Sequence, residues 1–171
     1  MTMPDNFYQF CDSQNQEDFV RSREYILNHF DYEPYSQDLH KLDGYFNKGE
    51  YDKVIDFESI NILLSPRANF IKGPACMKMD KVDLAIEYDT KGIKILEGIL
   101  RSGKNSFNSP LQILRVEDER DVINFLEDEL DQQRLKSTFN RDLDIIKCKS
   151  GKEYVFDVSL ILKKQGEQYD F

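Results

Sequence analysis

The spacing of apolar residues changes near Gly103, and this change limits the folds that the chain can adopt. Before it, apolar residues recur every three or four positions, as they do on helices that bury one face. After it, Tyr154, Phe156, Val158, Leu160 and Leu162 alternate with residues on the other face, which is typical of a strand. We therefore expect an α+β fold, with a helical region at 1–103 and an α+β region at 104–171 packed on it as one compact unit.

The first region predicts antiparallel helical hairpins. Its periodic runs predict helices over 14–31, 36–48, 51–64 and 82–103. Gly49 is placed to end the second helix, and such a short turn makes the flanking helices neighbours. Ser65-Pro66 is expected to end the third helix, and Gly73-Pro74 to interrupt the stretch before the fourth.

The second region predicts a small antiparallel sheet and one helix. Residues 111–116 predict a strand, and the acidic stretch 117–130 predicts a helix. Residues 143–162 predict a β-hairpin with its turn at Ser150-Gly151. The stretch 132–142 favours no element.

Five positions in the helical region resemble the tetratricopeptide (TPR) repeat. With Gly49 as the inter-helix glycine, Tyr45 matches the aromatic position, Val54 a small-residue position and Pro66 the closing proline. Ala85 matches the small-residue position of a second unit, at an offset of 85 − 54 = 31 residues, which is close to that repeat length. Small residues there allow two helices to approach closely.

The order of elements is also similar to that of a bacterial family of unknown function. In that family a degenerate TPR-like helical half precedes a strand, an acidic helix and a terminal β-hairpin. The matching segments here are GKNSFNSPLQILRVEDERDVINFL and LDIIKCKSGKEYVFDVS. The resemblance implies no established activity. By analogy of size and charge alone, such chains are similar to bacterial immunity and adaptor proteins.

The charge balance bears on possible partners. The chain holds 32 acidic and 23 basic residues, a formal charge of −9. Phosphate backbones and anionic lipids repel such a protein, so neither nucleic acid nor a membrane is an expected partner, and a basic protein is compatible. The first residues lack the pattern of a signal peptide, and Cys11, Cys76 and Cys148 are few and far apart. We expect reduced thiols and a cytoplasmic location.

Two groups of residues are candidates for contact with a partner protein. Acids are densest between residues 117 and 131, where they would speed association with a basic partner if exposed, although a solvated helix surface is the simpler interpretation. Tyr32 and Tyr35 lie in a proline-containing connection and are expected to be exposed. The candidate set is Glu117, Asp118, Glu119, Asp121, Glu127, Asp128, Glu129, Asp131, Tyr32 and Tyr35.

No residue pattern points to a catalytic, cofactor or metal site. The two histidines, His29 and His40, have no partner at ligand spacing, and the acids fit no calcium loop. Phosphate-loop, dinucleotide-binding and nucleophile-elbow motifs are absent from the sequence. Cys148 has lysine neighbours that could lower a thiol pKa, but its position on a strand favours a core role.

These observations lead to one hypothesis and one rival. The hypothesis is a non-catalytic protein-interaction module, an immunity or adaptor protein that binds a basic partner protein. The rival is an enzyme whose site is assembled from scattered acidic and tyrosine residues.

Overall fold

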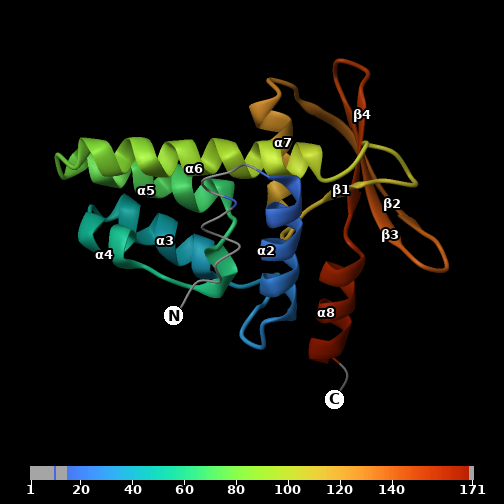
Figure 1. Cartoon of the computed structure of the whole chain (residues 1–171), viewed down its shortest axis with the longest axis horizontal. Coiled ribbons are helices and arrows are strands. Elements are labelled where there is room, and N and C mark those ends of the chain that lie inside the picture. Colours follow the sequence, from blue (N-terminus) through green and yellow to red (C-terminus); the bar gives the residue numbers. More distant parts are fainter. Residues whose placement is uncertain (1–9, 11–14, 170–171) are drawn as a thin grey trace. The chain divides into compact units, whose positions relative to one another are not determined.

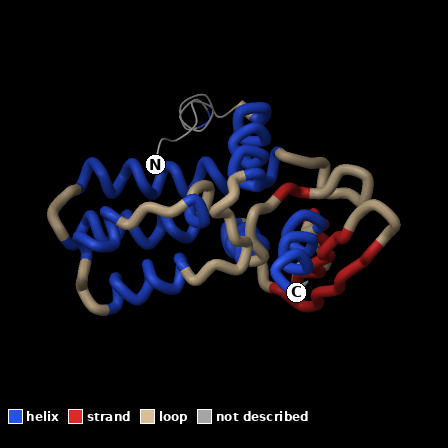
Figure 2. Tube along the Cα trace, turned by 90° about the horizontal axis from the view of Figure 1, so that it is seen from below, coloured by secondary structure: helices blue, strands red, loops and turns tan. Residues whose placement is uncertain are grey.

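The structure is a computed structural model that describes residue 10 and residues 15–169, without the side chains of 167–169. The chain forms two compact units, Met1–Ile95 and Leu96–Phe171, with their boundary inside the last helix of the first unit. Figure 1 labels the elements, and Figure 2 shows that helices dominate the first unit whereas the strands belong to the second. This arrangement confirms the predicted α+β class.

The first unit is helical. In chain order its elements are α2 (Gln16–Asn28), α3 (Asp38–Asn47), α4 (Tyr51–Asp56), the 3-10 turn η1 (Ile60–Ile62), α5 (Pro66–Lys78) and α6 (Val82–Arg101). Helices α3, α4 and α5 pack against one another around a core centred on Leu42, Val54 and Ala75. None of the helices in the described ranges combines the length and apolar character needed to cross a bilayer.

The predicted turn at Gly49 is confirmed. Gly49 has φ +74°, the left-handed conformation that glycine adopts at low cost. Its N–H donates to Phe46 O at 2.9 Å, and the N–H of Glu50 donates to Tyr45 O at 2.9 Å. Together these bonds form a Schellman motif, which ends α3 and sends α4 back along it. Tyr45 and Tyr51 pack against the core on either side of the turn.

The prediction of one helix over 51–64 is wrong. Helix α4 ends at Asp56, and Lys72 of α5 donates to Ile55 O at 3.0 Å and to Phe57 O at 2.7 Å. The ammonium group of Lys72 thus binds carbonyl groups at the end of a helix, where these groups have no intrahelical hydrogen-bond donor. Pro66 does not close a helix either, because it occupies the first turn of α5. Ser65 caps that helix by accepting from Ala68 N at 3.2 Å.

Gly73-Pro74 does not interrupt the helix, because α5 continues through both residues. A proline ring normally clashes with the Cβ atom of the preceding residue, and Gly73 has none. The missing side chain also allows α5 and α6 to approach closely. A Cβ atom at Gly73 would lie 2.2 Å from Asp89 Oδ1 and 3.4 Å from Ala85 O.

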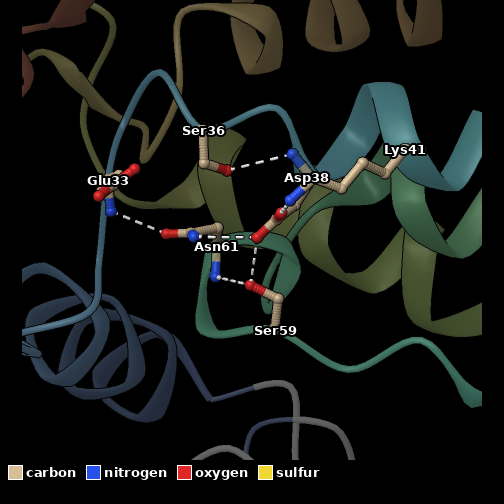
Figure 3. A network of polar contacts seen from close by, with 6 residues as sticks. All are labelled: Glu33, Ser36, Asp38, Lys41, Ser59 and Asn61. Carbon is tan, nitrogen blue, oxygen red and sulfur yellow. Dashed lines mark hydrogen bonds and ion pairs between the residues drawn. The ribbon is translucent and has the colours of Figure 1, made fainter.

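A buried polar network joins α3 to the η1 turn (Figure 3). Asp38 accepts from Ser59 Oγ at 2.6 Å, from Asn61 Nδ2 at 3.0 Å and from Lys41 Nζ at 2.9 Å. Asn61 in turn accepts from Glu33 N at 2.8 Å, which fixes the connection before α3. Burial opposes ionisation of Asp38, but the three hydrogen bonds outweigh it and lower its pKa.

Replacing Asp38 with asparagine is expected to lower the free energy of unfolding by about 2 kcal/mol at pH 7, because an amide cannot accept all three bonds. A group whose pKa is lowered by folding adds stability above its unfolded pKa, and this is lost as pH falls through the folded value. The gap between wild type and D38N should therefore narrow below about pH 4. Urea unfolding checks this, with the exposed Asp43→Asn on the same helix as control. Equal losses in both variants would contradict the role of the network.

The second unit contains a four-stranded sheet in the order β1-β4-β3-β2. The strands are β1 (Leu111–Gln112), β2 (Leu130–Ser137), β3 (Asp142–Cys148) and β4 (Glu153–Asp157). β2, β3 and β4 are antiparallel, whereas β1 runs parallel to β4. The sheet is therefore mixed, although the sequence predicted an antiparallel one. The predicted turn between β3 and β4 is confirmed, and Gly151 has φ +88°.

Three predicted boundaries in the second unit are wrong. The strand predicted over 111–116 is only two residues long, and helix α7 (Glu117–Phe125) ends before Leu130. The strand predicted to continue to Leu162 ends at Asp157, and helix α8 (Ser159–Tyr169) follows. Asp157 Oδ1 accepts from Ser159 N at 3.0 Å and from Ser159 Oγ at 2.6 Å, which turns the chain into the helix. The ambiguous stretch 132–142 forms most of β2 and the turn after it.

Candidate functional site

Two of the acids predicted to contact a partner are buried. Asp118 and Glu119, in the first turn of α7, are each only 1% exposed, so a surface role for them is wrong. Asp118 Oδ2 accepts from Leu114 N and from Arg115 N, both at 3.0 Å. Burial raises the pKa of Asp118, although Arg115 and these two N–H groups oppose the shift. Its carboxyl group therefore holds the backbone before α7 against the first turn of that helix, and does not face solvent.

Glu119 belongs to a cluster between α7 and the sheet. Gln133 on β2 donates to Glu119 Oε2 at 3.2 Å and to Asp144 Oδ2 on β3 at 2.6 Å. Burial, together with the charges of Asp144 and Asp118, raises the pKa of Glu119 to about 9. Glu119 is therefore protonated at neutral pH and shares a hydrogen bond with Asp144. An acid with such a pKa suits proton transfer, but a general acid must reach its substrate and this side chain does not reach the surface.

Two further acids are bound by the turn between β3 and β4. Asp128 accepts from the hydroxyl of Ser150 and from its N–H group, and Glu129 forms an ion pair with Lys149. The hydrogen bond from Ser150 is the main cause of the lowered pKa of Asp128. These acids connect the segment after α7 to the hairpin. Of the predicted acidic set, Glu117, Glu127, Glu129 and Asp131 are exposed, and Asp121 and Asp128 are half-buried.

The two tyrosines of the proline-containing connection differ in exposure. Tyr32 is 3% exposed, so its prediction as a contact residue is wrong, whereas Tyr35 is 40% exposed as expected. Tyr32 lies in the turn where its N–H donates to His29 O at 3.1 Å. Spacing in the sequence gave no means of separating the two, because neither belongs to a periodic element.

Reactive thiols and metal sites also receive no support from the geometry. Cys76 and Cys148 are buried, and burial raises the pKa of both thiols. A raised pKa keeps a thiol protonated and unreactive, in agreement with the core role predicted for Cys148. Within residue 10 and residues 15–169, no group of three or more histidine, cysteine or acidic side chains is arranged to hold a metal ion.

A group of exposed apolar side chains among the described residues of the helical unit lies on α5 and α6. We name it the α5–α6 face and define it by residues between 38% and 58% exposed: Phe70, Met77, Val82, Ile86 and Ile93. The Phe70 ring covers Gly92, where a Cβ atom would lie 2.6 Å from its Cε1 atom. Phe70 at the start of α5 is thus level with the second half of α6. The two helices are therefore antiparallel, and Met77 lies near the turn that leads to Val82.

One carboxylate lies within this apolar surface. Asp89 is exposed, and its side chain lies over Gly73, between the two helices. On α6, Val82, Ile86, Asp89 and Ile93 follow each other at intervals of four, three and four residues, which places them on one side of the helix. The buried side is a separate stripe that includes Ala85 and Ile95. The intervals of the exposed stripe distinguish it from the buried one in the sequence.

Comparisons of the chain with protein-family models, with curated proteins and with solved structures found no match. The TPR-like resemblance stays an interpretation of five residues. Its two small-residue positions, Val54 and Ala85, are buried, whereas Pro66 begins a helix.

Proposed function

We propose that the protein is a non-catalytic interaction module, an adaptor whose helical unit binds a cationic amphipathic segment of another protein. The observation that carries the proposal is the α5–α6 face, in which five large apolar side chains are exposed on two adjacent helices. Exposed apolar side chains that gather on one surface mark protein-binding sites more often than chance. An apolar face on two adjacent helices suits an amphipathic helix laid across it.

Charge supports a cationic partner. Residues Met1–Ile95 contain 17 acids and 11 bases, a formal charge of 11 − 17 = −6 out of the −9 of the whole chain. Asp89 places one carboxylate inside the apolar face, and Asp83 and Glu87 lie exposed on the same helix. A partner helix with leucines on one side and lysines around it would match both features, since complementary charges accelerate and orient association.

The rival enzymatic hypothesis gains nothing from the acid pair. Glu119 has the raised pKa of a general acid, but it is 1% exposed. Its protonation is explained by packing between α7 and the sheet.

A labelled cationic amphipathic helix, composed of leucine and lysine with the leucines on one side, tests the proposal by fluorescence anisotropy. Replacing both Ile86 and Ile93 with serine is expected to weaken its binding at least about tenfold, because apolar contact area is lost while charge is unchanged. Leu160→Ser on α8, a residue 45% exposed in the other unit, is the matched control and should bind like wild type.

A second peptide of the same composition, with leucine and lysine strictly alternating, separates shape from charge. It cannot form an apolar helical side and should bind at least about tenfold more weakly than the amphipathic helix. Unchanged binding of the double serine variant, or equal binding of the two peptides, would overturn the proposal.

A further inference from the structure

The β2–β3 hairpin carries an open strand edge that the proposed function does not use. β2 is the last strand of the sheet, and all eight of its side chains are exposed. They include Leu135, 57% exposed, and the turn that follows presents Phe139 fully to solvent. A strand that buries none of its side chains gains little from folding beyond its hydrogen bonds to β3.

The register identifies the free groups on this edge. Thr138 N donates to Arg141 O at 2.8 Å, and in the same register Lys136 lies opposite Leu143 and Arg134 opposite Ile145. Hydrogen-bonded pairs alternate along an antiparallel ladder, so every second residue of β2 points its N–H and C=O groups away from β3. These residues are Gln133, Leu135 and Ser137.

Positive charge gathers beside this edge in an otherwise acidic protein. Residues 132–141 contain three cations and no acid, and the loop 102–110 adds Lys104 and no acid. Arg134 forms an ion pair with Glu153 at 3.4 Å. For Lys136 and Arg141, no carboxylate among the described residues lies within ion-pair distance.

Lys136 and Arg141 line a hollow of about 480 Å³ between the hairpin and the loop 102–110. Lys136 Nζ lies 4.3 Å above the Phe107 ring, and Arg141 Nη1 donates to Asn108 O at 3.3 Å. These contacts position both cations, and both residues are exposed. Leu143 and the 45% exposed ring of Phe107 form the apolar part of the hollow.

We infer that an extended acidic segment of another protein adds to the sheet along β2, with its carboxylates bound by Lys136 and Arg141. The outward N–H and C=O groups of β2 match a polypeptide strand, which supplies the complementary ladder. The cations match its acidic side chains. Positive charge on an edge strand disfavours pairing with a second copy of the same edge, which argues for a different, acidic partner.

The test uses an end-blocked, fluorescein-labelled octapeptide in which glutamate alternates with valine, with binding to the full chain measured by anisotropy. Replacing Lys136 and Arg141 with glutamate together is expected to weaken binding at least about tenfold, and raising the salt concentration should weaken wild-type binding as well. Lys78→Glu with Lys81→Glu, two exposed lysines outside the second unit, makes the same change in net charge and should bind like wild type.

Three further probes separate the possible occupants. The same octapeptide with every backbone nitrogen methylated keeps its carboxylates but cannot donate to a ladder, so its binding should fall at least about tenfold. A lysine–valine octapeptide should not bind. An oligothymidylate of eight nucleotides should bind more weakly than the acidic peptide.

The proposal is overturned by no binding of the acidic peptide at about 1 mM, by equal binding of its methylated form, or by tighter binding of the oligonucleotide. Dimerisation of the wild type that the charge reversals do not affect would also overturn it, by assigning the edge to a second copy. These outcomes do not test the binding role proposed for the α5–α6 face. That role is tested by Ile86→Ser with Ile93→Ser, which leaves the β2–β3 hairpin unchanged.

Discussion

Replacing Glu119 with glutamine is expected to raise the free energy of unfolding by about 3 kcal/mol at pH 7. The wild-type carboxyl group must stay protonated in the folded protein, since its pKa is raised to about 9 from an ordinary 4.5. Glutamine is neutral without holding a proton, and its amide can donate to Asp144 in place of the acid hydrogen.

The sign of the pH dependence follows from proton binding. Below about pH 4.5 both the folded and the unfolded chain hold this proton, so Glu119 has no effect. Between about pH 4.5 and 9 only the folded chain holds it, so stability falls by about 1.4 kcal/mol per pH unit from this group. Urea unfolding of wild type and E119Q at pH 5, 7 and 9 should therefore diverge as pH rises.

Glu117→Gln is the matched control, because Glu117 lies exposed in the same helical turn. Its stability should stay within about 0.5 kcal/mol of wild type, with the same slope against pH. Parallel curves for wild type and E119Q would show that Glu119 is ionised in the folded protein, and would contradict the burial argument.

Replacing Gly103 with alanine is expected to lower the free energy of unfolding by about 3 kcal/mol. Its Cβ atom would lie 2.1 Å from Pro110 O and 2.8 Å from Ser109 O, both of them backbone atoms. The loop cannot easily move aside, because Lys104 N donates to Ser109 O at 2.9 Å. Urea unfolding measures the loss.

Gly44→Ala provides the control for this substitution. Gly44 lies inside α3, and an added Cβ atom there would meet nothing within 4 Å. Alanine should stabilise this helix by about 0.5–1 kcal/mol, because it restricts the unfolded chain more than glycine does. A loss in G44A as large as that in G103A would contradict the steric explanation.

The sequence predicted those parts of the fold that depend on neighbouring residues. Gly49 and Gly151 end their elements in left-handed conformations at the expected positions. One boundary failed where a distant residue intervened. Helix α4 ends at carbonyl groups bound by Lys72, 15 and 17 residues further along the chain, and no local pattern announces that bond.

Some of the predicted contact residues are exposed and others are buried, for a related reason. The local sequence does not distinguish an acidic side chain that faces water from one that faces the interior. Glu119 is buried because Gln133 and Asp144 lie against it from two strands that the chain reaches later. The exposed stripe of α6 could have been separated by its intervals, but its exposure depends on which side of the helix α5 covers.

The sequence by itself determined the α+β class, the tight glycine turns and the net negative charge, because each depends on composition or on residues a few positions apart. Only the tertiary structure decided that the sheet is mixed, that Asp118, Glu119 and Tyr32 are buried, and that the α5–α6 face and the β2 edge are exposed. Exposure is set by contacts between residues far apart in the chain. A pattern of neighbouring residues therefore limits it but does not fix it.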